Sequence, residues 1–211
     1  DILPSLRGKK LLEVGCGNGY WLRLFHSKGA QCVGVDVSKN QLAEAQKRNE
    51  SEKTRIIYYP SNGADLKVLG SQKFDIVFLE KVLLEVPALS QIRKIMKEAY
   101  RVTQKGGILV VSELHPAAVH FNIPNFKLTP EYGYFNSGST IKVISKRVDG
   151  NAISYTDYHW TLEDICNAIT DTGFKIVKIT EPRPRFSTVH KYPYLKYREG
   201  TPVDLLIKAI K

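Results

Sequence analysis

Short apolar runs alternate with helical patterns along the first half of the chain. The runs Lys10 to Val14 and Cys32 to Val35 are bounded by glycine, which is typical of buried parallel strands. Between them, Gly19 to Lys28 carries apolar residues at helical spacing, and Gly29 ends that pattern. The spacing therefore predicts a strand, a helix and a second strand in that order.

The same alternation continues as far as residue 112. Ser38 stands where a helix N-cap belongs, before a helix over Lys39 to Arg48. Strands are expected at Arg55 to Tyr59, Phe74 to Leu79 and Ile108 to Ser112, with a helix at Leu89 to Val102 that Gly106 and Gly107 end. Regular alternation implies a parallel sheet covered on both faces, so the sequence predicts a doubly wound α/β fold.

The alternation breaks after Pro116. Residues 116–160 are rich in Tyr, Phe, Asn and Gly, and they contain a candidate antiparallel pair at Thr140 to Arg147 and Ala152 to Tyr158. Asp149-Gly150 is a favourable hairpin turn between these two strands. We interpret 116–160 as a lid-like insertion after strand five, within a single domain that covers residues 1–211.

The C-terminal part returns to the earlier pattern. Thr161, with Asp164 three residues later, predicts the start of a helix over Leu162 to Thr172. Strands at Phe174 to Thr180 and Val203 to Ala209 complete the expected sheet.

Composition adds little to this picture. The chain has 211 residues, 43% of them hydrophobic and 25% charged, as in an ordinary globular domain. Its three cysteines show no metal-type spacing, so we expect neither a metal site nor a disulfide framework. With no apolar run of membrane-spanning length and no secretory signal pattern, the sequence predicts a cytoplasmic protein. The first strand begins so early that we expect an upstream segment, absent here or disordered.

The net charge of +10 raises the question of an acidic partner. The cations are scattered, and no run of five or more occurs, so a solvated surface is favoured over a nucleic-acid interface. Nucleic acid is therefore a disfavoured partner, and the oligomeric state stays open.

A glycine-rich loop carries the strongest functional signal. Glu13-Val14-Gly15-Cys16-Gly17-Asn18-Gly19 joins the first strand to the first helix, and its glycines allow a ligand to approach main-chain N–H groups closely. The spacing is G-x-G-x-G and not the dinucleotide G-x-G-x-x-G, and a carboxylate precedes the first glycine. A cofactor with a cationic amino-acid end suits such a loop better than a pyrophosphate.

Asp36 lies at the end of the second strand. A carboxylate there can accept hydrogen bonds from both hydroxyls of a ribose. Singly, a glycine turn and an Asp at a strand end are common structural features; in this order and on these elements they predict a nucleoside site.

The motif Leu11 to Gly19 resembles the first motif of the class I S-adenosylmethionine-dependent methyltransferases. Phe74 to Glu80 and Lys105 to Val111 resemble the fourth motif and the fifth strand with its turn. The resemblance implies a seven-stranded, mostly parallel sheet with a reversed C-terminal hairpin, and S-adenosyl-L-methionine as cofactor with S-adenosyl-L-homocysteine as product.

The resemblance also places the cofactor contacts. The expected contacts are Glu13, Gly15, Cys16, Gly17, Gly19, Asp36, Val37, Asn62, Gly63, Asp65, Leu79 and Glu80. Asn62 stands where the family most often has an Asp, so the contact with the adenine amino group is open between Asn62 and Asp65.

Three further segments resemble the small-molecule branch that includes the ubiquinone and menaquinone biosynthesis type. They are Glu113-Leu114-His115-Pro116, Tyr158-His159-Trp160-Thr161-Leu162 and Ala168 to Phe174. The resemblance implies a methyltransferase acting on a small molecule. The alternatives are an RNA or protein methyltransferase and a non-catalytic cofactor-binding regulatory subunit.

An acceptor that loses a proton requires a base, and histidine is suited to that role near neutral pH. His115, just after the fifth strand, and His159, at the end of the insertion, are the candidates, although either can be structural. Phe121, Tyr132 and Tyr158 are candidate substrate contacts, or else the insertion's own small core.

Overall fold

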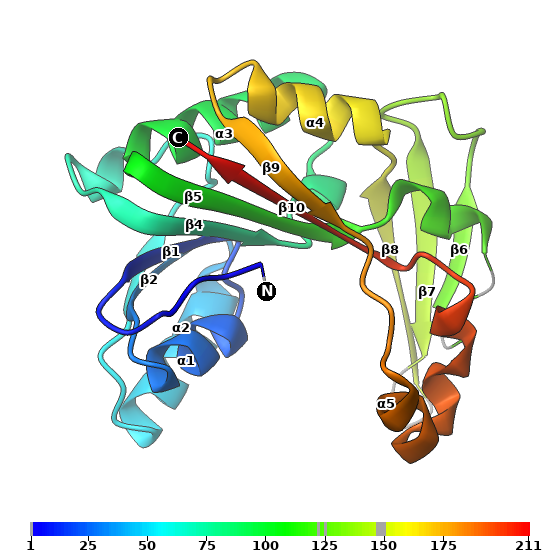
Figure 1. Ribbon diagram of the computed structural model, residues 1–211, viewed down its shortest axis with the longest axis horizontal. Helices are drawn as coiled ribbons and strands as arrows, with labels where there is room; N and C mark the ends of the chain where they lie inside the picture. Colours follow the sequence, from blue (N-terminus) through cyan, green and yellow to red (C-terminus); the bar gives the residue numbers. More distant parts are fainter. Residues whose placement is uncertain (1, 122, 125, 147–150) are drawn as a thin grey trace.

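The computed structural model describes residues 2–121, 123–124, 126–146 and 151–211. Within these ranges a seven-stranded sheet has the order β3-β2-β1-β4-β5-β10-β9 (Figure 1). The strands are β1 (Lys10–Val14), β2 (Gln31–Asp36), β3 (Ile57–Pro60), β4 (Phe74–Glu80), β5 (Thr103–Leu114), β9 (Lys175–Thr180) and β10 (Asp204–Ile210). Strand β10 runs antiparallel to β5 and to β9, whereas β1 to β5 pair in parallel. The predicted sheet and its reversed C-terminal hairpin are confirmed.

Helices cover both faces of this sheet. Helices α1 (Tyr20–Ser27) and α2 (Lys39–Ser51) pack on one face, and α3 (Leu89–Val102) and α4 (Leu162–Thr170) pack on the other (Figure 1). Each face has its own apolar core, because alternate residues of the strands point to opposite sides. In α3 the buried stripe consists of Ile92, Ile95, Met96, Ala99 and Val102, which repeat at helical spacing.

Two helices begin at capping side chains that could be identified in the sequence. The Ser38 hydroxyl accepts a hydrogen bond from the Gln41 amide at the start of α2. At the start of α4, Thr161 and Asp164 form a reciprocal capping box. Both predicted caps are confirmed, and they fix the chain direction as it leaves β2 and the insertion.

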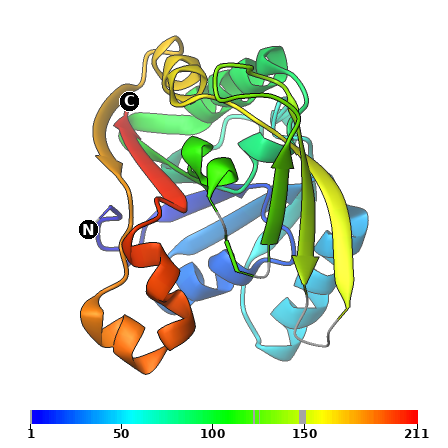
Figure 2. The same cartoon turned by 90° about the vertical axis from the view of Figure 1, so that its right-hand side faces the viewer.

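A second sheet, three-stranded within the described residues, consists of β6 (Phe126–Pro130), β7 (Thr140–Lys146) and β8 (Ala152–Tyr158). It lies beyond the end of the main sheet at which β5 finishes (Figures 1 and 2). We call it the small sheet. The β7–β8 pair matches the predicted hairpin, whose turn at Asp149-Gly150 lies outside the described residues. Strand β6 escaped sequence analysis because it is short, mostly exposed and ends at Pro130.

The junction between α3 and β5 differs from the expectation. The helix ends at Val102 as predicted, but Gly106 and Gly107 lie inside β5 and do not end it. Thr103 takes an extended conformation directly after the helix, and its hydroxyl donates to the Ala99 carbonyl at 2.7 Å. That bond satisfies a helix-end acceptor without a glycine.

The segment after β9 also differs. A short helix α5 (Phe186–Lys191) and a 3₁₀ helix η4 (Pro193–Glu199) occupy a segment for which the sequence predicted no regular element. Phe186 is 81% exposed, so α5 has no buried stripe from which sequence periodicity could reveal it. No helix in the described part of the chain combines the length and apolar character needed to cross a bilayer.

Candidate active site

The loop between β1 and α1 owes its shape to glycines with positive φ. Gly15 has φ 72° and Gly17 has φ 50°. A Cβ on Gly15 would lie 2.5 Å from the Val82 side chain, whereas a Cβ on Gly17 would meet nothing within 4 Å. Gly15 therefore lets the segment after β4 approach the loop, and Gly17 leaves open space beside the backbone.

The amide groups of this loop are used inside the protein. The Gly15 and Cys16 amides donate to the Val35 carbonyl at 2.8 and 3.0 Å, and the Gly17 amide donates to Asp36 Oδ2 at 2.7 Å. These N–H groups were expected to face a ligand. Their internal bonds leave a phosphate few donors, which agrees with the absence of the dinucleotide spacing.

Asp36 is held in place by two backbone amides. Its Oδ2 accepts from Gly17 and its Oδ1 accepts from the Ser38 amide at 2.8 Å. Each carboxylate oxygen can accept a further hydrogen bond. The carboxylate is thus oriented at the tip of β2, as a ribose contact requires.

Glu13 lies behind the loop and not on an open surface. It is 2% exposed, and its Oε2 has no hydrogen-bond partner among the described residues. Burial raises the pKa of this carboxyl well above its usual range, and the charges of Glu80 and Asp36 add to the effect. Glu13 is therefore a buried carboxyl behind the loop, without a hydrogen-bond partner at Oε2 among the described residues.

The loop after β3 separates the two candidates for the adenine contact. Asn62 Oδ1 accepts from the Ala64 and Asp65 amides at 3.1 Å each, which folds the loop into an Asx turn. The Asp65 carboxylate instead accepts from the Lys67 amide at 3.1 Å. Asn62 lines the adjoining cleft, and Asp65 does not.

These segments border an open cleft of about 690 Å³, which we call the glycine-loop cleft. Of the predicted contacts, the residues that line it are Gly15, Gly17, Asp36, Val37, Asn62 and Glu80. Its volume falls in the range of natural small-ligand sites. A nucleoside with a cationic end fits this set: a ribose-oriented carboxylate, bare glycine backbone and a second carboxylate at Glu80.

The other predicted contacts do not line the cleft: Glu13, Cys16, Gly19, Gly63, Asp65 and Leu79. Leu79 is fully buried, and the Cys16 thiol packs beneath the sheet against Gly34. A Cβ on Gly63 would lie 2.6 Å from Val14, so this glycine allows close packing. Direct contact by these side chains stays a prediction.

A second cleft, of about 390 Å³, lies between the small sheet and the start of β10. We call it the small-sheet cleft. Its lining residues are Lys81, Leu84, Glu85, Leu114, Ile123, Phe126, Leu128, Val143, Tyr155, Asp157, Tyr197, Arg198, Val203 and Asp204. Lys81 and Glu85 also line the glycine-loop cleft, so the two clefts adjoin.

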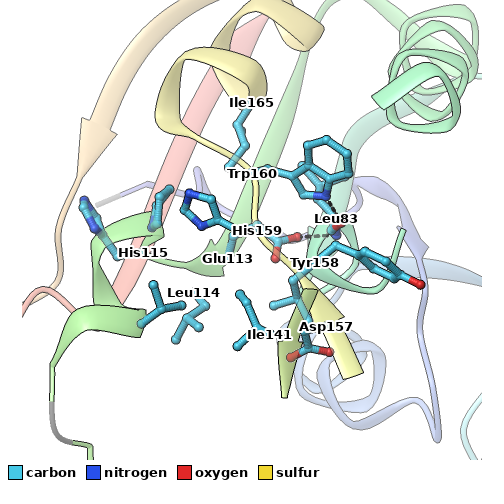
Figure 3. A pocket seen from close by; sticks show the side chains of 13 residues that line it. Leu83, Glu113, Leu114, His115, Ile141, Asp157, Tyr158, His159, Trp160 and Ile165 are labelled. Carbon is cyan, nitrogen blue, oxygen red and sulfur yellow. Dashed lines mark hydrogen bonds between the residues drawn. The ribbon is translucent and has the colours of Figure 1, made fainter. Parts of the chain in front are cut away.

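Glu113 fixes the segment that separates the clefts. It is 2% exposed, and its Oε1 accepts from the Val82 and Leu83 amides at 2.9 and 2.8 Å, just before the 3₁₀ turn η2 (Leu83–Glu85) (Figure 3). Burial raises the pKa of Glu113 to about 7. The Lys81 amide also donates to the Ser112 carbonyl. Strand β5 thereby positions both Lys81 and Glu85.

Asp204 forms ion pairs with both cationic side chains that line the small-sheet cleft. Its Oδ1 accepts from Lys81 Nζ at 2.9 Å and its Oδ2 accepts from Arg198 at 2.6 Å. An unpaired arginine at this position could bind an acidic group on a substrate. The pairing of Arg198 with Asp204 instead gives it a role within the protein.

The predicted bases His115 and His159 both line a narrow cavity of about 20 Å³ beside the small-sheet cleft (Figure 3). His115 Nδ1 accepts from the Ala117 amide, capping the turn η3 (Pro116–His120), and its Nε2 lies 3.0 Å from Glu181. His159 Nε2 lies 2.6 Å from the Tyr134 carbonyl. These contacts support structural roles for both rings, and a catalytic role stays a prediction.

The predicted substrate contacts are dispersed. Tyr158 lines the narrow cavity, while Phe121 and Tyr132 are 41% and 57% exposed and line neither cleft. The polar residues that the small sheet and its surroundings do bring together are Lys81, Glu85, Asp157 and Asp204, and sequence reasoning missed them. No motif marks them, because they come from distant segments. In the described residues, no group of three or more His, Cys, Asp or Glu side chains could hold a metal ion.

About half of the chain matches a known family of domains. Residues 12–111 match the family model described as a methyltransferase domain. The ubiquinone biosynthesis O-methyltransferase of Pseudomonas putida (strain GB-1) is 30% identical over 115 residues, which are 54% of this chain and 48% of that protein. The chain thus spans about half the length of the curated relatives it matches.

Solved structures extend the likeness to the whole fold. An S-adenosylmethionine-dependent methyltransferase from Mesorhizobium loti superposes with a TM-score of 0.75 at 23% identity, covering 100% of this chain and 94% of the other. A putative S-adenosylmethionine-dependent methyltransferase from Listeria monocytogenes gives 0.72 at 23%, covering 100% and 93%. Residues 12–111 thus match a methyltransferase domain, and the described chain has the fold of S-adenosylmethionine-dependent methyltransferases.

Proposed function

We propose that this protein transfers a methyl group from S-adenosylmethionine to a small molecule bound in the small-sheet cleft. Residues 116–160 act as the lid of this site within one domain that covers the chain. The cysteines Cys16, Cys32 and Cys166 are free, which agrees with action in the reducing cytoplasm.

One observation carries the proposal: the two clefts share Lys81 and Glu85. A group transferred from one ligand to another must cross a boundary common to both sites, and direct transfer requires the reacting atoms to lie within a few ångströms. The segment Lys81 to Glu85 is that boundary.

In this arrangement the chain's own residues bind and orient. Asp36 would hold the ribose hydroxyls, Asn62 would lie at the adenine, and Glu80 with the glycine loop would lie at the methionine end. When bound, the cofactor supplies an electrophilic methyl carbon on a sulfonium. The small-sheet cleft, with its mostly apolar wall, would orient the acceptor and exclude water from it.

Two measurements on the purified chain test the proposal. Calorimetric titration with S-adenosylhomocysteine should show saturable binding at one site. Incubation with methyl-labelled cofactor and a fractionated metabolite extract should transfer label to a small molecule.

Binding without transfer to any fraction would favour the non-catalytic subunit. Transfer of label to RNA or protein fractions alone would favour a macromolecular acceptor. In the latter case retention on heparin should fall steeply with salt, because phosphate contacts release counterions.

A further inference from the structure

The charges in the small-sheet cleft do not balance. Lys81 and Arg198 are both paired with Asp204. Glu85 and Asp157 line the same cleft, and no ion pair to either occurs among the described residues. The cleft therefore holds an uncompensated negative charge inside a largely apolar wall.

Asp157 carries most of this inference. It lies on β8, is 6% exposed and lines the cleft, yet no hydrogen bond reaches its carboxylate within the described part of the chain. Burial and the nearby charge of Glu85 raise the pKa of Asp157 to about 6. A buried, unpaired carboxylate is costly, so a ligand that brings it a cation or a donor is bound favourably.

The cofactor's own positive charge does not account for Asp157. Glu85 lines both clefts and Glu80 lines the glycine-loop cleft, so these carboxylates are available to the cationic methionine end. Asp157 lines the small-sheet cleft and not the glycine-loop cleft. The Asp157 carboxylate is therefore placed to contact the acceptor and not the cofactor.

The apolar wall of the cleft also suits an organic cation. The rings of Phe126, Tyr155 and Tyr197 line it, and aromatic faces attract ammonium groups. An anionic acceptor would face Asp157 and Glu85, while the two cations of the cleft are already bound to Asp204.

We propose that the acceptor is a small amine, bound as an ammonium by the Asp157 carboxylate with its apolar part against the aromatic wall of the small-sheet cleft. This inference rests on the proposed function and adds the class of acceptor. Similarity to an O-methyltransferase does not decide the acceptor atom, because most residues that line this cleft lie after residue 111, where the family match ends.

Asp157 also serves the chemistry of such an acceptor. An ammonium has no lone pair, so it must first give one proton to a base, and the Asp157 carboxylate accepts that proton to become a carboxylic acid. The free amine then forms the new N–C bond as the bond between methyl carbon and sulfur breaks, with its electron pair left on the sulfur. The product is a methylated ammonium, and Asp157 releases its proton to solvent.

Binding measurements test this without turnover. The full chain, saturated with S-adenosylhomocysteine, is titrated at pH 7.5 with phenethylamine, 2-phenylethanol or phenylacetate, which share a body and differ in the head group. We expect the amine to bind about tenfold more tightly than the alcohol, as one charge-assisted hydrogen bond gives, and phenylacetate to bind most weakly.

Asp157→Asn should abolish the preference for the amine and leave the affinity for the alcohol within about twofold. The matched control is Asp171→Asn, which removes the same charge from an exposed position after α4 and should keep the preference. Equal affinity for amine and alcohol, no amine binding at millimolar concentration, or an unchanged preference in Asp157→Asn would overturn the inference. Failure of S-adenosylhomocysteine to bind would instead overturn the proposed function.

The pH dependence in the unmodified protein provides a second test. The preference for the amine should rise between pH 5 and 7 as Asp157 loses its proton, since the amine stays protonated over that range. The titratable or charged groups around Asp157 are Lys81, Glu85, Tyr155, Tyr197, Arg198 and Asp204 in the small-sheet cleft, and Glu113, His115, Tyr158 and His159 in the narrow cavity. A preference that is flat over this range would count against Asp157 as the binding group.

Discussion

The two clefts adjoin but are constructed in opposite ways. The glycine-loop cleft takes its central residues, Gly15, Gly17 and Asp36, from consecutive elements of one strand–helix–strand unit, and a hydrogen bond joins Gly17 directly to Asp36. The small-sheet cleft takes Glu85, Asp157 and Asp204 from segments far apart in the chain.

This difference corresponds to two functions, binding of a common cofactor and binding of a specific acceptor. A cofactor common to many enzymes is held by backbone geometry that a short motif specifies. An acceptor specific to one enzyme is held by side chains that loops and added strands bring together, as is common for sites placed on a rigid scaffold. Mutations that affect one cleft and spare the other would sharpen this comparison.

The largest effect is expected at Glu113, which supports both clefts. Glu113→Ala leaves the buried Val82 and Leu83 amides without an acceptor, and we expect it to lower the free energy of unfolding by about 3 kcal/mol. Urea denaturation measures this. Glu113→Gln keeps one acceptor oxygen, so its free energy of unfolding should fall by less than half of the fall in Glu113→Ala. Equal losses in the two variants would show that the hydrogen bonds are not the cause.

A pair of glycine variants compares the inner and outer parts of the loop. Gly15→Ala and Gly17→Ala both place a side chain at positive φ, which costs about 1 to 2 kcal/mol. Gly15→Ala also pushes against Val82, so it should lose about 1 kcal/mol more by thermal or urea unfolding. Gly17→Ala should instead weaken S-adenosylhomocysteine binding, because Gly17 lines the glycine-loop cleft and its added methyl group would occupy space beside the ligand. The opposite ranking of stabilities would contradict this packing.

Asp36 and Asp65 test which side chains bind the nucleoside in the glycine-loop cleft. Asp36→Ala removes the ribose acceptor and the partner of the Gly17 amide, and we expect a loss of about 30-fold in S-adenosylhomocysteine affinity by calorimetry. Asp65→Ala, in the loop after β3 but outside the cleft, should change that affinity less than about twofold. If Asp65→Ala has the larger effect, the adenine contact has been assigned to the wrong side chain.

The smallest effect is expected at His115. His115→Ala removes the cap on the Ala117 amide and should cost about 1 kcal/mol of stability, while His115→Asn should restore most of it. A structural role predicts that kcat with the acceptor stays within about threefold in His115→Asn. A fall of two orders of magnitude or more would instead make the imidazole the base.

The strands of the main sheet and the helices between them could be predicted from their apolar patterns, although β5 begins at Thr103 and not at the predicted Ile108. Lys10–Val14 and Leu89–Val102 have the bounds expected from their patterns. Strand β6 and helix α5 could not be predicted because they are mostly exposed and lack a periodic apolar face. Hydrophobic periodicity reports burial, so it fails where an element buries little.

The sequence by itself determined the glycine loop, the position of Asp36 and the match of residues 12–111 to a methyltransferase domain. These features depend on residues close together in the chain, where spacing and glycine content dictate the backbone. Only the tertiary structure decided that the loop's amides bond inward, that Asn62 and not Asp65 lines the cleft, and that Asp157 and Glu85 line one cleft. Which charges pair and which stay free depends on distances between distant segments, and packing alone sets those distances.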